Sequence, residues 1–273
     1  MTIDYHAQTV LLTGASSGIG ASFAVALAAR GSNLVLVARR AERLESMAGE
    51  LRREYGVRVE AIPFDLSCPA VGSELREAVA SRGVAVTSLI NNAAFGTFGT
   101  FAESDSERLA AEIAVDTAAP VQLTAAFMPQ MLSADHGFII NVAGVSAYFP
   151  SPRMAVYSAA KAFVLSFSES LWTELRGTGL TVFALCPGAT DTDFTTGMGT
   201  GASVLRSGRL RTPEDVVTTA LDHLERRNPG PTVIDGRSNQ LGAIMSRVVS
   251  RRTSAMMMER VVNPNRRSKP PAS

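Results

Sequence analysis

The chain has 273 residues, of which 46% are hydrophobic and 19% charged, and its formal net charge is +1. This length and composition predict a soluble globular protein with a substantial core, and they exclude a disordered or fibrous chain. No apolar run approaches the roughly 18 residues of a membrane helix, and the first residues lack a secretory signal pattern, so we expect a cytoplasmic protein. Cys68 and Cys186 are too few for a disulfide framework or a metal cluster, and we expect no metal.

Positive charge is concentrated towards the C-terminal end. Residues 237–273 contain eight basic residues against Glu259 alone, a net charge of +7, whereas residues 1–236 contain 18 basic and 24 acidic residues, a net charge of −6. Such a charge asymmetry is typical of a protein that binds an anionic partner or a membrane surface. We favour a solvated terminal helix and tail, keep membrane contact as the alternative, and expect no nucleic-acid partner.

Short apolar runs alternate with helix-forming segments along the chain. This alternation predicts an α/β protein with a single-domain, Rossmann-like, doubly wound parallel sheet of about seven strands. Without an internal repeat or a linker, residues 1–238 are predicted to form one domain, with 239–273 as its basic helical extension. Strands are predicted at 10–12, 34–38, 57–62, 88–90, 138–142, 181–185 and 232–234, and helices at 21–29, 41–55, 69–82, 105–133, 152–176, 213–226 and after 239.

Proline, serine and glycine mark several helix boundaries. Pro129 is expected to bend or close the helix at 105–133. Ser151 and Pro152 suit the N-cap and the first position of the helix that follows, and Gly177 is expected to end that helix.

A glycine-rich turn separates the first strand from the first helix. Gly14, Gly18 and Gly20 carry no Cβ, so backbone N–H groups and a helix N-terminus face whatever lies above the turn. A simple tight turn is the alternative, but the position between a strand and a helix favours a dinucleotide pyrophosphate. The other residues of this turn expected to contact the cofactor are Ser16, Ser17 and Ile19.

Two arginines follow the second predicted strand. NAD-binding folds often place an acid there to hold the ribose hydroxyls, but this chain has Arg39 and Arg40. Guanidinium groups fit a 2′-phosphate, so we expect NADP (NADPH) in preference to NAD. The alternative is that both arginines are solvated residues at a helix start.

Tyr157 and Lys161 lie four positions apart and should share one helix face. The ammonium group favours the phenolate, so we expect a lowered tyrosine pKa and proton transfer near neutral pH. An accidental helical pair with a solvated lysine is the alternative. Lys161 and Lys269 are the only lysines of the chain, which argues against a generic surface cation.

The motifs Thr13-Gly14-x-x-x-Gly18-Ile19-Gly20, Asn91-Asn92-Ala93-Ala94, Tyr157-x-x-x-Lys161 and Pro187-Gly188 occur in order. With them, residues 7–236 resemble the short-chain dehydrogenase/reductase family. The resemblance implies Tyr157 as the proton donor or acceptor and Lys161 as its partner, which also binds the nicotinamide ribose. It further implies that Asn91 steadies the sheet and that the cofactor is contacted by Asp65, Leu66, Asn92, Ala93, Pro187, Gly188, Thr190 and Thr192.

Two positions depart from the family's catalytic tetrad. The serine that stands thirteen residues before the tyrosine is replaced by Gly144, and the asparagine of the preceding helix corresponds to Asp116. Ser146 would replace the missing hydroxyl if the loop is locally rearranged, and the alternative is a loop hydroxyl bonded to backbone. Tyr148 and Ser151 are weaker candidates.

The segments expected around the substrate, 144–153 and 188–210, are apolar. We therefore predict an NADP-dependent oxidoreductase acting on an apolar ketone or secondary alcohol, and a homo-dimer or homo-tetramer by resemblance. The alternative is a non-redox enzyme or an NADP-binding regulatory protein. The side chains expected to line the pocket, or to belong to the core instead, are Phe95, Tyr148, Phe149, Met154, Phe194, Met198 and Leu205, with Met256, Met257 and Met258 as adaptable packing.

Overall fold

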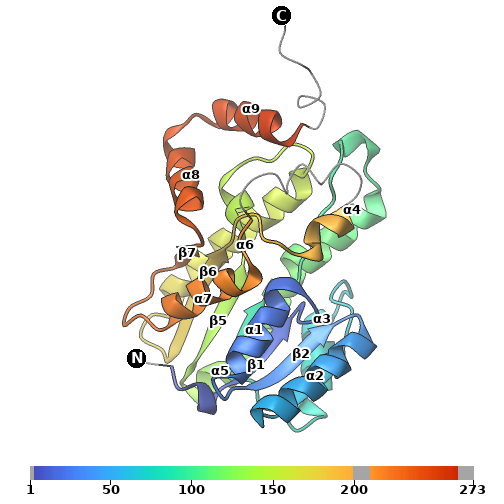
Figure 1. The fold of residues 1–273 in the computed structure, drawn as a ribbon, viewed down its shortest axis with the longest axis vertical. Helices are drawn as coiled ribbons and strands as arrows, with labels where there is room; N and C mark the ends of the chain where they lie inside the picture. The colour runs from blue at the N-terminus through green and yellow to red at the C-terminus, as the bar shows by residue number, and fades with distance from the viewer. Residues whose placement is uncertain (1–2, 199–209, 264–273) are drawn as a thin grey trace, which may run out of the picture.

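The computed structural model of the chain describes residues 3–198 and 210–263, except for the side chains of 195–197. Its centre is a seven-stranded sheet with strand order β3-β2-β1-β4-β5-β6-β7 (Figure 1). All six strand pairs are parallel. The predicted doubly wound α/β fold is therefore confirmed, and the order reverses beside β1, where such sheets bind ligands at the carboxyl ends of the strands.

The strands and helices follow the predicted alternation closely. The strands are β1 (Thr9–Thr13), β2 (Asn33–Ala38), β3 (Val59–Pro63), β4 (Ser88–Asn91), β5 (Gly137–Val142), β6 (Leu180–Cys186) and β7 (Thr232–Ile234). The α-helices are α1 (Gly18–Ala28), α2 (Ala41–Tyr55), α3 (Val71–Ala80), α4 (Ser106–Ile113), α5 (Ala119–Ala134), α6 (Ala155–Glu174), α7 (Pro213–Leu224), α8 (Arg237–Val248) and α9 (Arg251–Val262).

Helices cover both faces of the sheet because alternate strand residues point to opposite faces. On one face, α1, α2 and α7 pack through residues such as Phe23 and Leu44 against Leu12 and Phe183. On the other face, α3 and α5 pack through residues such as Leu75 and Phe127. These two apolar layers hold the sheet rigidly, so that the loops at its carboxyl edge start from fixed positions.

Two of the boundary signals act differently from the prediction. Pro129, expected to bend or close its helix, does not close it, because it lies inside α5, which continues to Ala134. The helix α6 begins at Ala155 rather than at Pro152, because Arg153 has a φ of 65° and interrupts the helical backbone. Gly177, with a φ of 89°, follows the end of α6 as expected.

The last two helices, α8 and α9, follow one another at one end of the molecule (Figure 1). Asn239 of α8 ties this end to the sheet, because its Nδ2 donates to the carbonyl of Asp235 at 2.7 Å. Within residues 3–198 and 210–263, no helix combines the length and the apolar character needed to cross a bilayer.

Candidate active site

The glycine-rich turn after β1 is too crowded for any side chain at its three glycines. Gly14 and Gly18 have φ values of 65° and 53°, and a Cβ on Gly20 would lie 2.2 Å from the carbonyl oxygen of Gly14. Ser17 is the N-cap of α1 and makes no side-chain capping hydrogen bond there. A Cβ-free turn that leads into a helix N-terminus fits the pyrophosphate of a dinucleotide.

The segment after β4 is held against this turn. Thr13 Oγ1 accepts hydrogen bonds from the backbone N–H groups of Asn92 and Ala93, both at 3.0 Å. Asn92 Nδ2 donates to the carbonyl of Thr13 at 2.9 Å. Behind it, Asn91 Nδ2 donates to Asn141 Oδ1 at 2.8 Å, joining β4 to β5 in the buried sheet. The two loops at the switch point of the sheet are therefore fixed relative to each other.

Arg39 and Arg40 lie on the surface beside the glycine-rich turn. Arg40 Nη2 donates to Ser16 Oγ and to Ser17 Oγ, each at 3.2 Å. Ser67 donates from its N–H and its hydroxyl to Asp65, which lowers the pKa of that carboxyl, and the charge of Arg39 lowers it further. The two guanidinium groups thus flank the end of β2, where a 2′-phosphate would sit.

The side chain of Leu66 does not face this site. It is buried among apolar residues between the sheet and α3. If this position contacts the cofactor, as the family pattern implies, the contact comes from its backbone.

The loop after β6 returns to the same edge. Pro187 accepts a hydrogen bond from the N–H of Val145 at 2.9 Å, and a Cβ on Gly188 would lie 2.3 Å from Asn239 Nδ2. Thr190 Oγ1 donates to the carbonyl of Gly188 at 3.1 Å. The methyl group of Thr192 would lie 2.9 Å from a Cβ on Gly18 of the glycine-rich turn. The structure therefore brings these predicted cofactor residues to one edge of the sheet.

Tyr157 and Lys161 lie on the first turns of α6, and Lys161 is buried rather than solvated. Its Nζ donates to the carbonyl of Val142 at 3.3 Å and lies 3.3 Å from Asp116 Oδ2. The same Nζ lies 5.4 Å from the centroid of the Tyr157 ring. The alternative of a lysine in solvent is therefore wrong, because 4% of this side chain is exposed.

Asp116 reaches Lys161 from a single π-helical turn, η3 (Ala114–Ala118), that separates α4 from α5. The fully buried carboxylate also accepts a hydrogen bond from the N–H of Phe95 at 3.0 Å. Burial raises the pKa of Asp116, and the charge of Lys161 and this hydrogen bond act in the opposite direction. Inserted π turns are frequent at functional sites, and here one turns a carboxylate towards the lysine.

The pKa of Tyr157 is raised, not lowered as the sequence suggested. Burial is the largest cause, and the negative charges of Asp116 and Glu112 add to it, while a hydrogen bond with the Ser146 side chain acts in the opposite direction. Lys161 was expected to lower the pKa of Tyr157, but this effect is offset because the lysine charge is paired with Asp116. The phenol therefore stays protonated at neutral pH in the protein without bound cofactor.

Gly144, in place of the family serine, bends the loop between β5 and α6. Its φ of 88° and ψ of 159° lie in a region that essentially only glycine adopts. Directly after it, the short helix η4 (Val145–Tyr148) carries Ser146, whose side chain lies close enough to Tyr157 to act against the rise in the pKa of its phenol. The loop is thus bent directly before Ser146, and the replacement of the missing hydroxyl by Ser146 stays a prediction. Tyr148 packs beside Cys186, and Ser151 is buried.

An apolar cluster adjoins Tyr157. The ring of Phe194 lies 5.4 Å from the ring of Tyr157. The buried members of the cluster are Phe98, Met154, Met198 and Val262, with Tyr157, Phe194 and Met258 packed against them. Of the side chains expected at the substrate, Met154, Phe194 and Met198 come together here, whereas Phe95 lies against Arg108, Phe149 contacts α8, and Leu205 lies outside the described residues.

Sequence reasoning missed Gly96 and Phe98. A Cβ on Gly96 would lie 2.6 Å from Met198 Cε and 3.2 Å from Tyr157 Cδ2, so this segment passes close to the tyrosine ring and a side chain here would require both neighbours to shift. The N–H of Phe98 donates to the carbonyl of Met198 at 2.9 Å. The glycines and the phenylalanine of the segment Gly96-Thr97-Phe98-Gly99, just after the Asn91 motif, were the sequence signal that could have indicated these positions.

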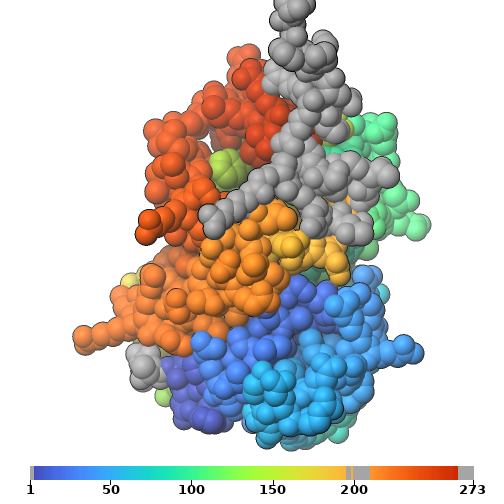
Figure 2. All heavy atoms as spheres, viewed as in Figure 1, coloured from blue at the N-terminus to red at the C-terminus, as the bar shows by residue number. Residues whose placement is uncertain are grey.

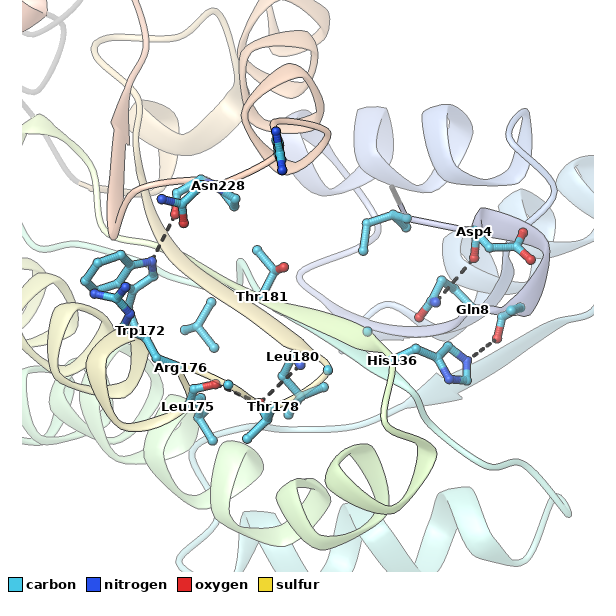
Figure 3. A pocket seen from close by; sticks show the side chains of 18 residues that line it. Asp4, Gln8, His136, Trp172, Leu175, Arg176, Thr178, Leu180, Thr181 and Asn228 are labelled. Carbon is cyan, nitrogen blue, oxygen red and sulfur yellow. Dashed lines mark hydrogen bonds between the residues drawn. The ribbon is translucent and has the colours of Figure 1, made fainter. Parts of the chain in front are cut away.

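A cavity of about 510 Å³ lies at the opposite, amino edge of the sheet (Figure 3). It is lined by residues near the starts of β1, β5 and β6, including Gln8, His136 and Leu180. Because Tyr157 and the glycine-rich turn lie at the carboxyl edge, this cavity is not part of the candidate active site.

Comparison with known proteins agrees with this geometry. The family model described as short chain dehydrogenase matches residues 8–202. A 7beta-hydroxysteroid dehydrogenase from Collinsella aerofaciens is 30% identical over 234 residues, which cover 84% of this chain and 86% of that protein. The chain therefore belongs to the short-chain dehydrogenase/reductase family, whose named members include dehydrogenases and reductases.

Solved structures show the same fold with nicotinamide cofactors. A short-chain dehydrogenase from Sphingobium yanoikuyae in complex with NADPH has a TM-score of 0.78 and 35% identity, covering 88% of this chain and 93% of that chain. A family member from Burkholderia phymatum in complex with NAD has a TM-score of 0.78 and 25% identity, covering 89% of this chain and 93% of that chain. The region matched by this chain spans 52% to 65% of the length of three fungal relatives, which are therefore longer proteins.

Proposed function

We propose that the protein is an NADPH-dependent reductase of apolar ketones, with Tyr157 as the proton donor. The observation that carries the proposal is the position of Tyr157, between the buried Lys161 and an apolar cluster at the edge of the sheet that carries the glycine-rich turn. When bound there, NADPH supplies the hydride for the carbonyl carbon. Tyr157 Oη gives its proton to the carbonyl oxygen, which becomes the hydroxyl of the alcohol.

The proton that ketone reduction requires is available on Tyr157 at neutral pH. A raised pKa keeps the Tyr157 phenol protonated, and only the protonated form donates to the substrate oxygen. Oxidation of an alcohol needs the phenolate as the base, so it should become efficient only at more alkaline pH. Asp116 sets this balance, because it adds negative charge near the phenol and pairs with the lysine that would otherwise stabilise the phenolate.

We assign the missing polarising hydroxyl to Ser146. Gly144 supports this role because its positive φ turns the loop, and the Ser146 side chain that follows lies close enough to Tyr157 to act against the rise in the pKa of its phenol. A carbonyl oxygen placed to accept the proton of Tyr157 would then also accept a hydrogen bond from Ser146. Such a donor is worth about 10²- to 10³-fold in rate, so the changed tetrad is compatible with efficient turnover.

The preference for NADPH rests on Arg39 and Arg40. Neither position carries the acid that would hold ribose hydroxyls, and Arg40 already bridges the end of β2 to the serines of the glycine-rich turn. Each guanidinium group offers charge-assisted hydrogen bonds to a 2′-phosphate, with Asp65 beyond them towards the expected adenine position. The NADPH complex of the Sphingobium yanoikuyae relative supports the same cofactor.

The test is the oxidation of NADPH in the presence of a panel of apolar ketones. Tyr157→Phe should lower kcat by at least about 10²-fold while leaving NADPH binding, measured by fluorescence, within a few-fold of wild type. Tyr55→Phe, at the end of α2, is the matched control and should leave kcat unchanged. Full turnover by Tyr157→Phe would contradict the proposal.

The altered tetrad favours one second candidate, a cofactor-binding protein that transfers no hydride. It predicts tight NADPH binding without oxidation of NADPH by any ketone of the panel. Two parts of the proposal remain. A cytoplasmic location is tested by fractionation. A homo-dimer or homo-tetramer rests on family resemblance and is tested by light scattering.

A further inference from the structure

The helix α8 carries a continuous apolar stripe that nothing in the described chain covers. Leu241, Ile244, Met245 and Val248 follow the three- and four-residue spacing of one helix face. Between 50% and 76% of each of these residues is exposed. The other face of α8 contacts the body, because Ala243 is buried and a Cβ on Gly242 would lie 3.6 Å from the ring of Phe149.

The next helix, α9, repeats this two-faced arrangement. Its inner face places Met258 and Val262 in the apolar cluster beside the catalytic tyrosine. On its outer side, Met256, Met257 and Val261 are each more than half exposed. In Figure 2, α8 and α9 form the outer edge of one end of the molecule. Contiguous exposed apolar surface of this kind is rare on a monomer and marks an interaction site.

The charge around these stripes is almost entirely positive. Arg247, Arg251, Arg252 and Arg260 are exposed on or beside the two helices. The one acid among residues 237–263, Glu259, already accepts a hydrogen bond from Asn263 Nδ2 at 3.0 Å. The sequence adds Arg266, Arg267 and Lys269 directly after the described residues. The occupant of this surface must therefore offer apolar area and negative charge together.

We propose that the α8–α9 surface, defined by these exposed apolar residues and arginines, docks on an anionic lipid bilayer. A basic amphipathic helix lies in the bilayer interface with its apolar stripe among the acyl chains and its arginines at the phosphates. A second copy of the chain fits less well, because a two-fold contact would bring the same arginines together without acids to oppose them. The proposal is independent of the reductase activity, since it concerns binding alone.

Co-flotation of the full chain with vesicles tests the proposal. The vesicles consist of phosphatidylcholine alone or with one-third phosphatidylserine. We expect binding to the anionic vesicles only, weakened by salt. Arg251→Gln with Arg252→Gln should lower the partition coefficient about 30-fold, since each arginine near the surface contributes ~1 kcal/mol. Leu241→Ser with Ile244→Ser should lower it by more than about tenfold.

Matched controls separate the surface from general charge and apolarity. Arg53→Gln with Arg76→Gln removes two exposed arginines of α2 and α3, and Val25→Ser removes an exposed apolar residue of α1. Both should bind like wild type, and circular dichroism should show every variant folded. Equal binding to neutral vesicles, absence of binding, or controls that lose binding as strongly would each overturn the proposal. So would a dimer that dissociates only in Leu241→Ser with Ile244→Ser, because the surface would then join two copies.

Discussion

Removing the Ser146 hydroxyl tests how the substrate oxygen is held. The bend at Gly144, with φ 88° and ψ 159°, is followed by Ser146, whose side chain acts against the rise in the pKa of Tyr157, and no serine stands at the usual family position. Ser146→Ala removes one donor to the developing oxyanion. We expect kcat to fall about 10²- to 10³-fold, equivalent to ~3–4 kcal/mol of transition-state stabilisation.

The companion change, Gly144→Ser, should not rescue the loss. A Cβ there would have room, with Ser146 Oγ at 3.5 Å and the Pro187 carbonyl oxygen at 3.7 Å as its nearest neighbours. The cost lies in the backbone, because a side chain at this positive φ is strained by about 1–3 kcal/mol. We therefore expect a lower free energy of unfolding and no gain in kcat.

Steady-state kinetics at saturating NADPH measures both effects. Ser170→Ala, an exposed serine on α6, is the matched control and should keep the wild-type kcat. Cofactor binding should also be unchanged in Ser146→Ala, because the hydroxyl contacts the tyrosine and not the glycine-rich turn. Wild-type kcat in Ser146→Ala, or a higher kcat in Gly144→Ser, would refute the reasoning.

Three further changes test other parts of the site and fold. Asp116→Asn removes a charge that raises the pKa of Tyr157, so the loss of reductase kcat/KM at alkaline pH should begin about one pH unit lower. An unchanged pH profile of kcat/KM would contradict this effect of the Asp116 charge. Arg39→Ala with Arg40→Ala should lower kcat/KM for NADPH about 10- to 100-fold and leave that for NADH unchanged, whereas equal losses would argue against 2′-phosphate recognition. Arg211→Met leaves the fully buried Asp235 without its bidentate partner, whose nitrogens lie 2.9 and 3.0 Å from the carboxylate oxygens. The free energy of unfolding in urea should fall by about 1–3 kcal/mol, a modest loss because the partly exposed guanidinium is screened by solvent. An unchanged urea midpoint would show that the pair adds nothing to stability.

The fold could be predicted from the sequence because each strand, turn and helix depends mainly on its own residues. The apolar run of β2 (Asn33–Ala38) is typical of a strand buried on both faces. Gly14, Gly18 and Gly20 permit the positive φ values and close contacts of the turn between β1 and α1. The parallel order then follows from the alternation of strands and helices. The residues of the cofactor edge could be named because they lie directly after these strands.

The electrostatics of the site could not be predicted in the same way. The π turn that aims Asp116 at Lys161 adds one residue to a helical turn, and no residue type announces it. The raised pKa of Tyr157 depends on burial and on charges from another helix, which sequence spacing does not contain. The late start of α6 depends on the positive φ of Arg153, a conformation that arginine rarely adopts.

The most direct test of the central claim follows the hydride itself. The protein is incubated with NADPH deuterated at the transferable position of the nicotinamide ring and with an apolar ketone that is turned over in the panel. The account predicts an alcohol that carries one deuterium on the former carbonyl carbon, and almost none of this product with Tyr157→Phe. Tight NADPH binding with no deuterium in any product would contradict the assignment of this site as a carbonyl reductase.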